Sequence, residues 1–348
     1  MKNPYSIGFG KIPTQYINRD IIIDEIVDIF SGDEPSQQAV KLTGMRGTGK
    51  TVTLTALERR FEQEKGWIVV GLKSNSELRE DLVAKLYSSV SFITTFIDKE
   101  VNLSAFGIGV NISDKSPVAS IDFALEEIMK LVKKRGKKVL VTIDEARNTE
   151  AMVDFIQEFQ ILIRKDLPIF LIAAGLYEDI ESIENTDGLT FFLRTEKYEM
   201  KPLSLKIIKE DYKEVLNISD EVAEQMARIT KGYAFAFQAL GKYMWDTKST
   251  AVNDKILAYF DQALAEKVYE KVWSELAQSD KDYLQFFSQK EQMPVSDLLE
   301  LTGKKHNEWS KSRKRLKDKG IIDVSLRGQI KLALPRFGEF IKDISEEA

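Results

Sequence analysis

The sequence predicts an α/β fold built on a parallel sheet, followed by a helical segment and a small C-terminal module of helices and a hairpin. Three observations support this prediction. The apolar run Ala39–Thr43 leads directly into a glycine-rich segment, and a helical pattern and a second apolar run follow it. Two further apolar runs, Val139–Ile143 and Ile169–Ala174, alternate with helical patterns. After Pro202 the strand signals stop, and helical patterns fill the chain up to the C-terminal module.

The bulk composition is that of an ordinary folded protein. The chain has 348 residues, of which 43% are hydrophobic and 30% charged, so two or three domains are expected. The absence of cysteine excludes disulfides and thiolate metal sites, and the single histidine, His306, excludes a multi-histidine site. No signal peptide is evident, and the longest apolar run, Ile169–Tyr177, is too short to cross a bilayer. We therefore expect a cytoplasmic protein with no membrane partner.

The elements follow in order along the chain. A helix over Asp20–Phe30 precedes the first strand, and a helix over Thr51–Gln63 precedes the strand Trp67–Leu72. Tyr198–Met200 is a candidate fifth strand. The alternating segment Val101–Ser113 predicts an extended hairpin, either an exposed interaction arm or an extra sheet edge. Further helices are expected over Glu77–Ile97, Ser120–Lys134, Met152–Arg164, Lys206–Leu216, Asp220–Ile229, Ala234–Trp245 and Asn253–Leu276.

The glycine-rich segment Gly44–Thr51 fits the pattern G-x-x-x-x-G-K-[ST] without a mismatch. Its glycines let backbone N–H groups turn toward a β-phosphate, while Lys50 supplies positive charge for the β and γ oxygens and the Thr51 hydroxyl is a Mg²⁺ ligand. The segment also opens a helix, whose N-terminus favours anions. It therefore predicts binding of ATP or ADP with Mg²⁺. The expected cofactor contacts here are Gly44, Arg46, Gly47, Thr48, Gly49, Lys50, Thr51 and Val52.

A second motif supports the first. The apolar strand Val139–Ile143 ends in Asp144 and Glu145, which places two adjacent carboxylates at its C-terminal tip. Asp144 is expected to hold the magnesium through water, and Glu145 to orient and deprotonate the attacking water. Alone, the same pair would be equally consistent with a helix cap of no chemical consequence.

Arg194 precedes the last predicted strand. From there it is able to reach a γ-phosphate on a neighbouring subunit of a homo-oligomer, where it would neutralise charge in the transition state. The alternative is a surface arginine that pairs with Glu196.

The C-terminal module is basic. Between Gly303 and Arg336 the local charge is +8, whereas the whole chain carries −5. Helices are expected over Ser279–Gln289, Pro294–Leu301 and His306–Lys319, followed by a hairpin around Leu326-Arg327-Gly328. This is the winged helix-turn-helix order, with Trp309, Leu316 and Ile321 facing the core, and it predicts a double-stranded DNA partner. The alternative is a protein-binding winged helix with a solvated basic face. The expected DNA contacts are Lys311, Arg313, Lys314, Arg315 and Arg327.

These motifs, taken together, resemble the AAA+ ATPases of the AAA_16/ORC-like ATP-binding group, which border on the STAND signalling ATPases. Tyr16-Ile17-Asn18-Arg19-Asp20 resembles the family's adenine-side box, which implies base contacts from Tyr16, Ile17 and Arg19. Ala174-Gly175-Leu176 resembles the family's "AGL" after the fourth strand. Thr230-Lys231-Gly232-Tyr233-Ala234 resembles its lid signature, which implies cofactor contacts from Gly232 and Tyr233. The resemblance implies an AAA+ core over 1–202, a helical lid over 203–276 and a winged helix over 277–348.

The sequence also departs from the family pattern. The fourth strand ends in Ala173, Ala174 and Gly175, where AAA+ enzymes usually carry a polar sensor residue. Ala234 stands where the lid signature usually has proline, and only Lys231 is a distant candidate for the second sensor. These departures leave nucleotide binding intact and predict slow ATP hydrolysis.

Two functions of different class compete. In the first, the chain is a DNA-binding ATPase of initiator or mobile-element type, in which hydrolysis of ATP to ADP switches the lid and so the DNA-binding surface. In the second, it is a STAND-like signalling scaffold that binds nucleotide and uses its winged helix for a protein partner. A metabolic kinase is a weaker third idea, because no acceptor-substrate domain is visible.

Overall fold

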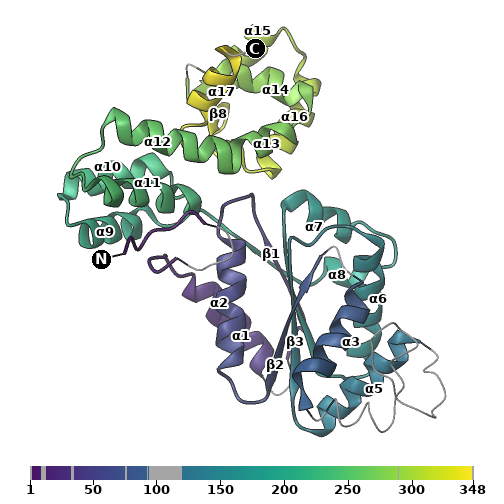
Figure 1. The fold of residues 1–348 in the computed structure, drawn as a ribbon. Helices are drawn as coiled ribbons and strands as arrows, with labels where there is room; N and C mark the ends of the chain where they lie inside the picture. The colour runs from purple at the N-terminus through teal and green to yellow at the C-terminus, as the bar shows by residue number, and fades with distance from the viewer. Residues whose placement is uncertain are drawn as a thin grey trace. The chain divides into compact units, whose positions relative to one another are not determined.

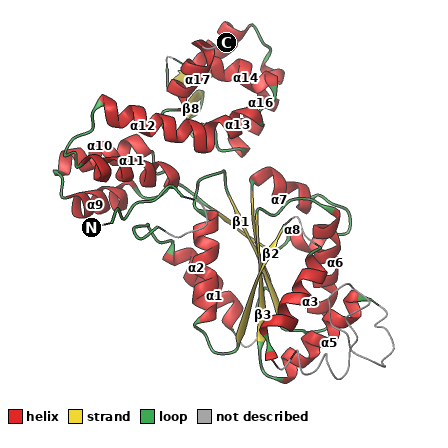
Figure 2. Cartoon of the chain, in the orientation of Figure 1, coloured by secondary structure: helices red, strands yellow, loops and turns green. Residues whose placement is uncertain are grey.

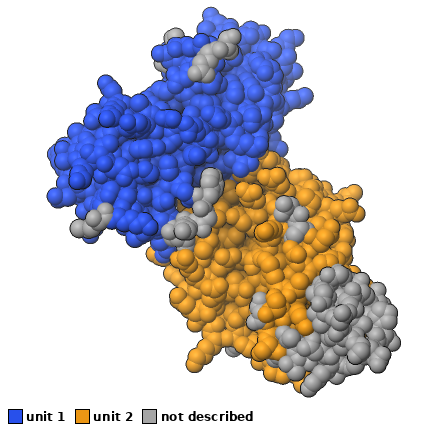
Figure 3. All heavy atoms as spheres, in the orientation of Figure 1, with its two compact units in different colours: residues 1–18, 44–49, 200–348 blue, residues 19–43, 50–199 orange. Residues whose placement is uncertain are grey.

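The computed structural model describes residues 2–8, 13–32, 35–74, 77–91, 93, 120–288 and 290–346 (Figure 1). It divides the chain into two compact units, which Figure 3 distinguishes by colour. The sheet unit comprises residues 19–43 and 50–199, and the helical unit comprises residues 1–18, 44–49 and 200–348. The expected hairpin Val101–Ser113 lies outside the described residues.

The sheet unit contains a five-stranded sheet in which all pairs of neighbouring strands are parallel (Figure 2). The strand order is β2-β3-β4-β1-β5. Every position of β1 and β4 is buried, as expected for parallel strands covered on both faces. Because the strands are parallel, the C-terminal ends of β1 and β3 lie at the same edge of the sheet. The strands are β1 (Ala39–Thr43), β2 (Trp67–Lys73), β3 (Lys138–Asp144), β4 (Ile169–Gly175) and β5 (Glu196–Glu199).

Helices cover both faces of this sheet. Helices α1 and α2 pack on one face, and α3, α5 and α6 pack on the other (Figure 1). An aromatic cluster fills the first interface, with Phe61 and Trp67 at a ring distance of 4.5 Å and Phe30 and Phe170 at 5.1 Å. The helices of this unit are α1 (Asp20–Ser31), α2 (Lys50–Glu62), α3 (Leu78–Ser89), α5 (Ile121–Lys134), α6 (Glu150–Arg164), α7 (Tyr177–Glu184) and α8 (Thr190–Leu193).

One charged side chain lies in the centre of the sheet unit. Lys41 on β1 is fully buried, and its ammonium group donates to Glu184 Oε1 at 2.7 Å and to the Phe192 carbonyl at 2.6 Å. The other Glu184 oxygen accepts from Lys197 at 2.8 Å. Burial lowers the pKa of Lys41, and the hydrogen bond and charge of Glu184 oppose that shift. This network fixes the end of α8 against β1 and β5.

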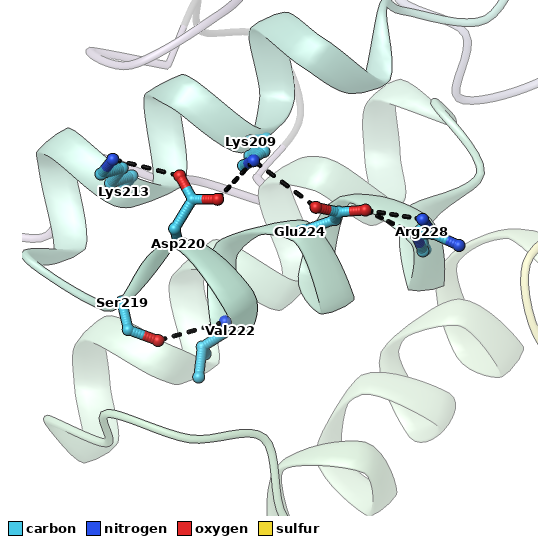
Figure 4. A network of polar contacts seen from close by, with 7 residues as sticks. All are labelled: Lys209, Lys213, Ser219, Asp220, Val222, Glu224 and Arg228. Atoms are coloured by element: carbon cyan, nitrogen blue, oxygen red, sulfur yellow. Dashed lines mark hydrogen bonds and ion pairs between the residues drawn. The ribbon is translucent and has the colours of Figure 1, made fainter.

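The first two helices of the helical unit form an antiparallel pair, and ion pairs connect their facing surfaces (Figure 4). The Asp220 carboxylate on the second helix accepts from Lys209 at 2.6 Å and from Lys213 at 3.1 Å on the first, and within the second helix Glu224 accepts from Arg228 at 2.6 Å. The Ser219 hydroxyl caps the second helix by accepting from the Val222 N–H. The helices of this part are α9 (Leu205–Leu216), α10 (Asp220–Thr230), α11 (Ala234–Thr247), α12 (Asp254–Leu264), a π-helical turn (Ala265–Tyr269) and α13 (Glu270–Ser274).

The C-terminal part of the helical unit combines short helices with a three-stranded antiparallel sheet, in the order β6-β8-β7. Trp309, Leu316 and Ile321 are buried, which confirms the core-facing residues expected from the sequence. One hydrophobic core continues from Leu203 through α9–α13 to Ile341 in the last helix. The elements are α14 (Gln278–Leu284), a 3₁₀ turn (Gln285–Phe287), β6 (Gln292–Pro294), α15 (Val295–Thr302), α16 (His306–Asp318), β7 (Ile322–Asp323), β8 (Gln329–Leu332) and α17 (Phe337–Glu346).

Several elements differ from the sequence expectation, among them helices α7 and α8, which were not expected. The predicted long helix Asn253–Leu276 is interrupted by the π-helical turn Ala265–Tyr269, where Tyr269 turns inward and donates to the Pro335 carbonyl. Strand β6 was not expected, because a strand of three residues is too short to show periodicity. Helix α17, which begins directly after Arg336, was not expected either. None of the helices in the described ranges combines the length and apolar character needed to cross a membrane.

Candidate nucleotide site

The two sequence motifs meet in the sheet unit. Thr51 lies in the first turn of α2, and Asp144 is the last residue of β3. The Thr51 hydroxyl donates to Asp144 Oδ2 at 2.7 Å, although the two residues are 93 positions apart in the sequence. A hydroxyl and a carboxylate at this separation suit two protein positions around a Mg²⁺ ion, which takes its remaining ligands from phosphates and water. Within the described ranges no three acidic or histidine side chains gather into a metal site.

Glu145 occupies an unusual backbone conformation. Its φ angle is +52°, in the left-handed region that a residue with a Cβ rarely adopts. This turn lets the next residue, Ala146, donate its N–H to the Ala174 carbonyl of β4 at 2.8 Å. The Glu145 side chain is 66% exposed and lies 3.8 Å from the Arg147 guanidinium. Strained non-glycine residues cluster at functional sites, and this carboxylate is open to a substrate water.

Helix α2 and strand β3 are held together beneath these groups. Thr142 on β3 donates its hydroxyl to Glu58 Oε1 on α2 at 2.5 Å. Burial raises the pKa of Glu58, the Thr142 hydrogen bond opposes the shift, and the charges of Glu62 and Asp144 add to it. This contact fixes the axial position of α2, and with it Thr51, relative to Asp144.

The glycine loop, residues Gly44–Gly49, belongs to the helical unit. Gly47 and Gly49 have φ angles of +74° and +94°, which only glycine adopts without strain. The Gly47 carbonyl accepts from the Phe235 N–H at 3.0 Å, and the Arg46 carbonyl accepts from the Tyr233 hydroxyl. Over the described part of the chain, the N–H groups of Gly47 and Gly49 have no hydrogen-bond acceptor. The loop therefore directs carbonyls to the helical unit and keeps two N–H groups available for an anion.

Tyr233 packs directly on this loop. Its hydroxyl lies 2.3 Å from the position that a Cβ on Gly47 would take, so no larger residue fits there. Burial raises the pKa of the Tyr233 hydroxyl far above its usual range, with the charge of Arg46 acting in the opposite direction, and the phenol stays a hydrogen-bond donor. Gly232 is packed as closely, because an added Cβ would meet the Leu203 carbonyl oxygen at 2.5 Å.

The residues expected on the adenine side of the nucleotide lie in both units. Tyr16 and Ile17 are half-buried in the helical unit, where Ile17 packs on the hydrophobic core. Arg19 precedes α1 in the sheet unit, and burial lowers the pKa of its guanidinium. The N-terminal segment is fixed by Tyr5, whose hydroxyl donates to Asp211 at 2.8 Å. Gln238 anchors the same segment by donating to the Gln15 carbonyl at 2.7 Å.

The other residues singled out from the sequence lie on α2, after α10 and at the end of β4. Lys50 is half-buried at the start of α2, and Val52 follows Thr51 there. The Lys231 ammonium donates to Glu291 at 3.0 Å and to the carbonyls of Leu332 and Leu334, so it serves the packing of the helical unit. Ala173 and Ala174 are fully buried at the end of β4. The described sheet unit thus places no polar side chain at these two positions.

Arg194 ends the short helix α8 and is exposed. Among the described residues it has no ion-pair partner, so the alternative pairing with Glu196 is not formed. The backbone N–H of Glu196 donates to Gln37 Oε1 at 2.7 Å. Arg194 therefore presents its guanidinium to solvent.

The basic residues of α16 have two different roles. Lys311, Arg313 and Lys314 lie on the exposed face of α16, and Arg327 is exposed in the turn between β7 and β8. Arg315 instead donates to both carboxylate oxygens of Asp280, whose side chain is only 1% exposed. The hydrogen bonds from Arg315 to Asp280 raise the pKa of this arginine.

Sequence reasoning missed residues that support the site from a distance. Glu58, Glu275 and Phe235 contact Thr142, Arg46 and Gly47, respectively. None belongs to a motif, and their partners lie between 84 and 229 positions away. The only signal in the sequence is the position of Phe235 directly after the lid signature.

Solved structures share the overall fold of this chain. The structure of a Walker-type ATPase of Pyrococcus abyssi superposes with a TM-score of 0.62 at 15% identity, covering 93% of this chain and 95% of that one. The ORC2 protein of Aeropyrum pernix in ADPNP and ADP complexes gives 0.63 at 11% identity, with coverage of 98% and 96%. Cdc6p from Pyrobaculum aerophilum gives 0.50 at 14% identity, with coverage of 98% and 97%. At these identities the likeness shows the fold alone, which is the α/β fold with a parallel sheet expected from the sequence.

Sequence comparisons add one family. Residues 266–341 match the model of a domain of unknown function, DUF8462, which extends from the π-helical turn into α17. No curated protein matches the chain.

Proposed function

We propose that this chain is an AAA+ ATPase that binds ATP with Mg²⁺ at Gly44–Thr51 and hydrolyses it slowly to ADP. The observation that carries the proposal is the 2.7 Å contact between Thr51 and Asp144, because it joins two independent motifs into one phosphate-and-metal site. The magnesium, when bound, supplies charge neutralisation between the β- and γ-phosphates. Tyr16, Ile17, Arg19, Gly232 and Tyr233 are proposed to hold the remainder of the nucleotide.

The chain's own residues supply the other steps. Lys50 places its ammonium on the β and γ oxygens, and the N–H groups of Gly47 and Gly49 bind the β-phosphate. Glu145 accepts a proton from the water that attacks the γ-phosphorus, and ADP leaves as the bond to the γ-phosphate breaks. In a homo-oligomer, the exposed Arg194 of a neighbour is proposed to stabilise the charge of the transition state. The apolar end of β4 lacks a polar sensor, which supports slow turnover.

Phosphate release and nucleotide binding test this proposal directly. Glu145→Gln is expected to bind ATP as the wild type does while turnover falls at least ~10²-fold, because the general base is lost and the phosphate-binding residues Gly44–Thr51 are unchanged. Thr51→Val is expected to lose the gain in ATP affinity that Mg²⁺ provides. Thr55→Val, the same change one turn later on α2, is the matched control and leaves both measurements unchanged. Wild-type protein that binds neither ATP nor ADP would contradict the proposal.

We further propose that residues 277–348 form a winged helix that binds double-stranded DNA, with residues 1–202 as the ATPase core and 203–276 as its lid. Three helices, α14–α16, followed by the β7–β8 hairpin support this interpretation. The exposed Lys311, Arg313, Lys314 and Arg327 are the proposed phosphate contacts, whereas Arg315 is engaged by Asp280. ATP hydrolysis would then switch the DNA-binding surface of a cytoplasmic protein.

Duplex binding by fluorescence anisotropy across a salt series tests the second part. Four phosphate contacts predict a slope of log K against log[salt] of about −3.6. Lys311→Ala and Lys314→Ala are each expected to reduce the steepness by about 1. With Glu145→Gln to block turnover, affinity in ATP and in ADP should differ. Binding that is absent at low salt in both nucleotide states would end the DNA interpretation.

A second candidate function rests on two exposed apolar side chains of the same module. Leu301 on α15 is 58% exposed, and Leu326 in the β7–β8 turn is 61% exposed. Apolar side chains at the tip of a wing suit a protein surface better than phosphates. A STAND-like scaffold would therefore show salt-insensitive binding to a protein partner that Leu326→Ser weakens and Lys311→Ala does not.

A further inference from the structure

Three groups elsewhere in the helical unit hold the glycine loop: the Tyr233 hydroxyl, the Phe235 N–H and the Glu275 carboxylate. The Tyr233 hydroxyl donates a hydrogen bond to the Arg46 carbonyl, and the Phe235 N–H donates one to the Gly47 carbonyl. Phe235 itself packs against the helical core. Each of these two hydrogen bonds uses a carbonyl group, and each leaves the N–H groups of Gly47 and Gly49 without a competing acceptor in the described structure. The loop is therefore held in the conformation that an anion needs.

A third contact involves a charge pair that no motif contains. The Arg46 guanidinium donates to Glu275 Oε1 at 3.1 Å, and Lys271 reaches the same oxygen at 3.2 Å. The Arg46 and Glu275 side chains are 25% and 32% exposed, so both are largely withdrawn from water. Among the residues that the structure describes, the Nε of Arg46 is buried without an acceptor. Burial tends to raise the pKa of Glu275, but the hydrogen bonds and charges of Arg46 and Lys271 lower it, so the carboxylate is ionised.

The position of Glu275 connects the loop to the C-terminal part. Glu275 directly follows α13 and lies within the segment 266–341 that matches the domain of unknown function. A second contact joins the same regions, because Met45 Sδ lies 2.9 Å from the position that a Cβ on Gly320 would take. Gly320 comes just after the basic helix α16. Two neighbouring loop residues, Met45 and Arg46, thus touch the beginning and the middle of this C-terminal region.

We propose that Glu275 is a positioning residue of the glycine loop: it restrains Arg46, keeps the loop ready for phosphate, and couples nucleotide occupancy to the C-terminal region. The inference rests on the proposed nucleotide binding at this loop. Coupling between two sites is reciprocal, so a contact that prepares the loop for nucleotide is itself strengthened when nucleotide binds. Glu275 touches no substrate in this role and acts through Arg46.

The test compares Glu275→Gln with Glu270→Gln, the same change at an exposed position five residues earlier on the same helical segment. ADP affinity is measured by titration calorimetry without Mg²⁺, which removes the contribution of Thr51 and Asp144. Partly exposed ion pairs of this kind predict that Glu275→Gln weakens ADP binding about two- to fivefold. Glu270→Gln is expected to bind as the wild type does.

Two further measurements separate positioning from a general loss of stability. Without nucleotide, Glu275→Gln should speed amide exchange in the peptide that contains Gly44–Gly49, while exchange in the sheet strands stays unchanged. In an Arg46→Ala background, Glu275→Gln should have no further effect on ADP affinity, because its partner is absent.

Opposite results overturn the inference. An affinity that is unchanged or tighter in Glu275→Gln, with wild-type exchange in the loop, would show that the pair does not prepare the loop. If the wild-type protein binds no nucleotide, the proposed function fails. The exchange comparison would then still report whether Glu275 restrains the loop, so the two failures are distinguishable.

Discussion

At the scale of single residues, the candidate site depends on a side chain that performs no chemistry. Glu58 holds α2 to β3 through Thr142, and its carboxylate is half-buried close to Asp144. Its ionised form is therefore destabilised in the folded protein. An ionisable group in such a place costs stability at neutral pH, yet it accepts the hydrogen bond that fixes the distance between Thr51 and Asp144.

Glu58→Gln is expected to raise the stability at neutral pH. Burial raises the pKa of Glu58 in the folded state above its usual 4.5, so the folded wild type binds protons more tightly than the unfolded chain. The wild-type free energy of unfolding then falls as pH rises from the unfolded pKa through the folded one. Glutamine keeps an oxygen for Thr142 and does not titrate.

Thermal unfolding at several pH values checks this prediction. The variant should exceed the wild type by a few degrees in melting temperature at neutral pH, and the difference should vanish below about pH 4, where Glu58 is protonated in both states. Glu210→Gln, at an exposed position of α9, is the control and should change neither value. A variant that is less stable than the wild type at neutral pH would show that the ionised carboxylate is the favourable form.

At the scale of elements, helix α16 has two basic residues with opposite functions two positions apart. Arg313 is on the exposed face, whereas Arg315 neutralises the buried Asp280 on α14 and also contacts the Ser312 hydroxyl at 3.1 Å. The α16–α14 packing depends on that ion pair, because removing the arginine leaves a buried carboxylate without its cation.

Arg315→Ala is expected to lower the free energy of unfolding by about 2 kcal/mol, less than for a fully buried pair because the arginine side chain is 42% exposed. Arg313→Ala should change stability by less than about 0.5 kcal/mol and weaken duplex binding instead. Denaturant unfolding and anisotropy, performed on the same two proteins, separate the roles. Equal stability of both variants would mean that Asp280 is solvated.

At the scale of the whole molecule, the proposed lid and the proposed winged helix share one hydrophobic core within the helical unit. Its core runs without a break from Leu240 in α11 through Phe260 in α12 to Leu332 in β8, and all three side chains are fully buried. The core of the sheet unit is separate and includes Leu171 on β4. We infer that each unit unfolds cooperatively.

Core truncations in the two units check this inference by calorimetry and hydrogen exchange. Leu240→Ala and Leu332→Ala should each destabilise the helical unit by about 2–5 kcal/mol and speed exchange in both its lid and its C-terminal helices. Leu171→Ala should affect the sheet unit. Loss of protection confined to residues 277–346 in Leu332→Ala would show that the C-terminal part unfolds independently.

The sequence by itself determined the α/β core and the location of the proposed phosphate site. Strand β1 was predicted with its observed bounds, and the other strands of the parallel sheet to within two residues, because apolar runs between helices leave few alternatives. Motif residues such as Lys50, Thr51 and Asp144 were identified because each must follow a strand or open a helix at fixed spacing. The basic face of α16 was visible for the same reason, as a charge pattern along one helix.

Only the tertiary structure decided which partner each of these residues has. That Arg315 neutralises Asp280, that Glu275 holds Arg46, and that Lys231 donates to the Leu332 carbonyl depend on contacts across 35 to 229 positions. The left-handed turn at Glu145 likewise follows from the pairing of Ala146 with Ala174 on the next strand. Local periodicity carries no information about such contacts, because the free energy that selects them comes from packing between segments distant in the chain.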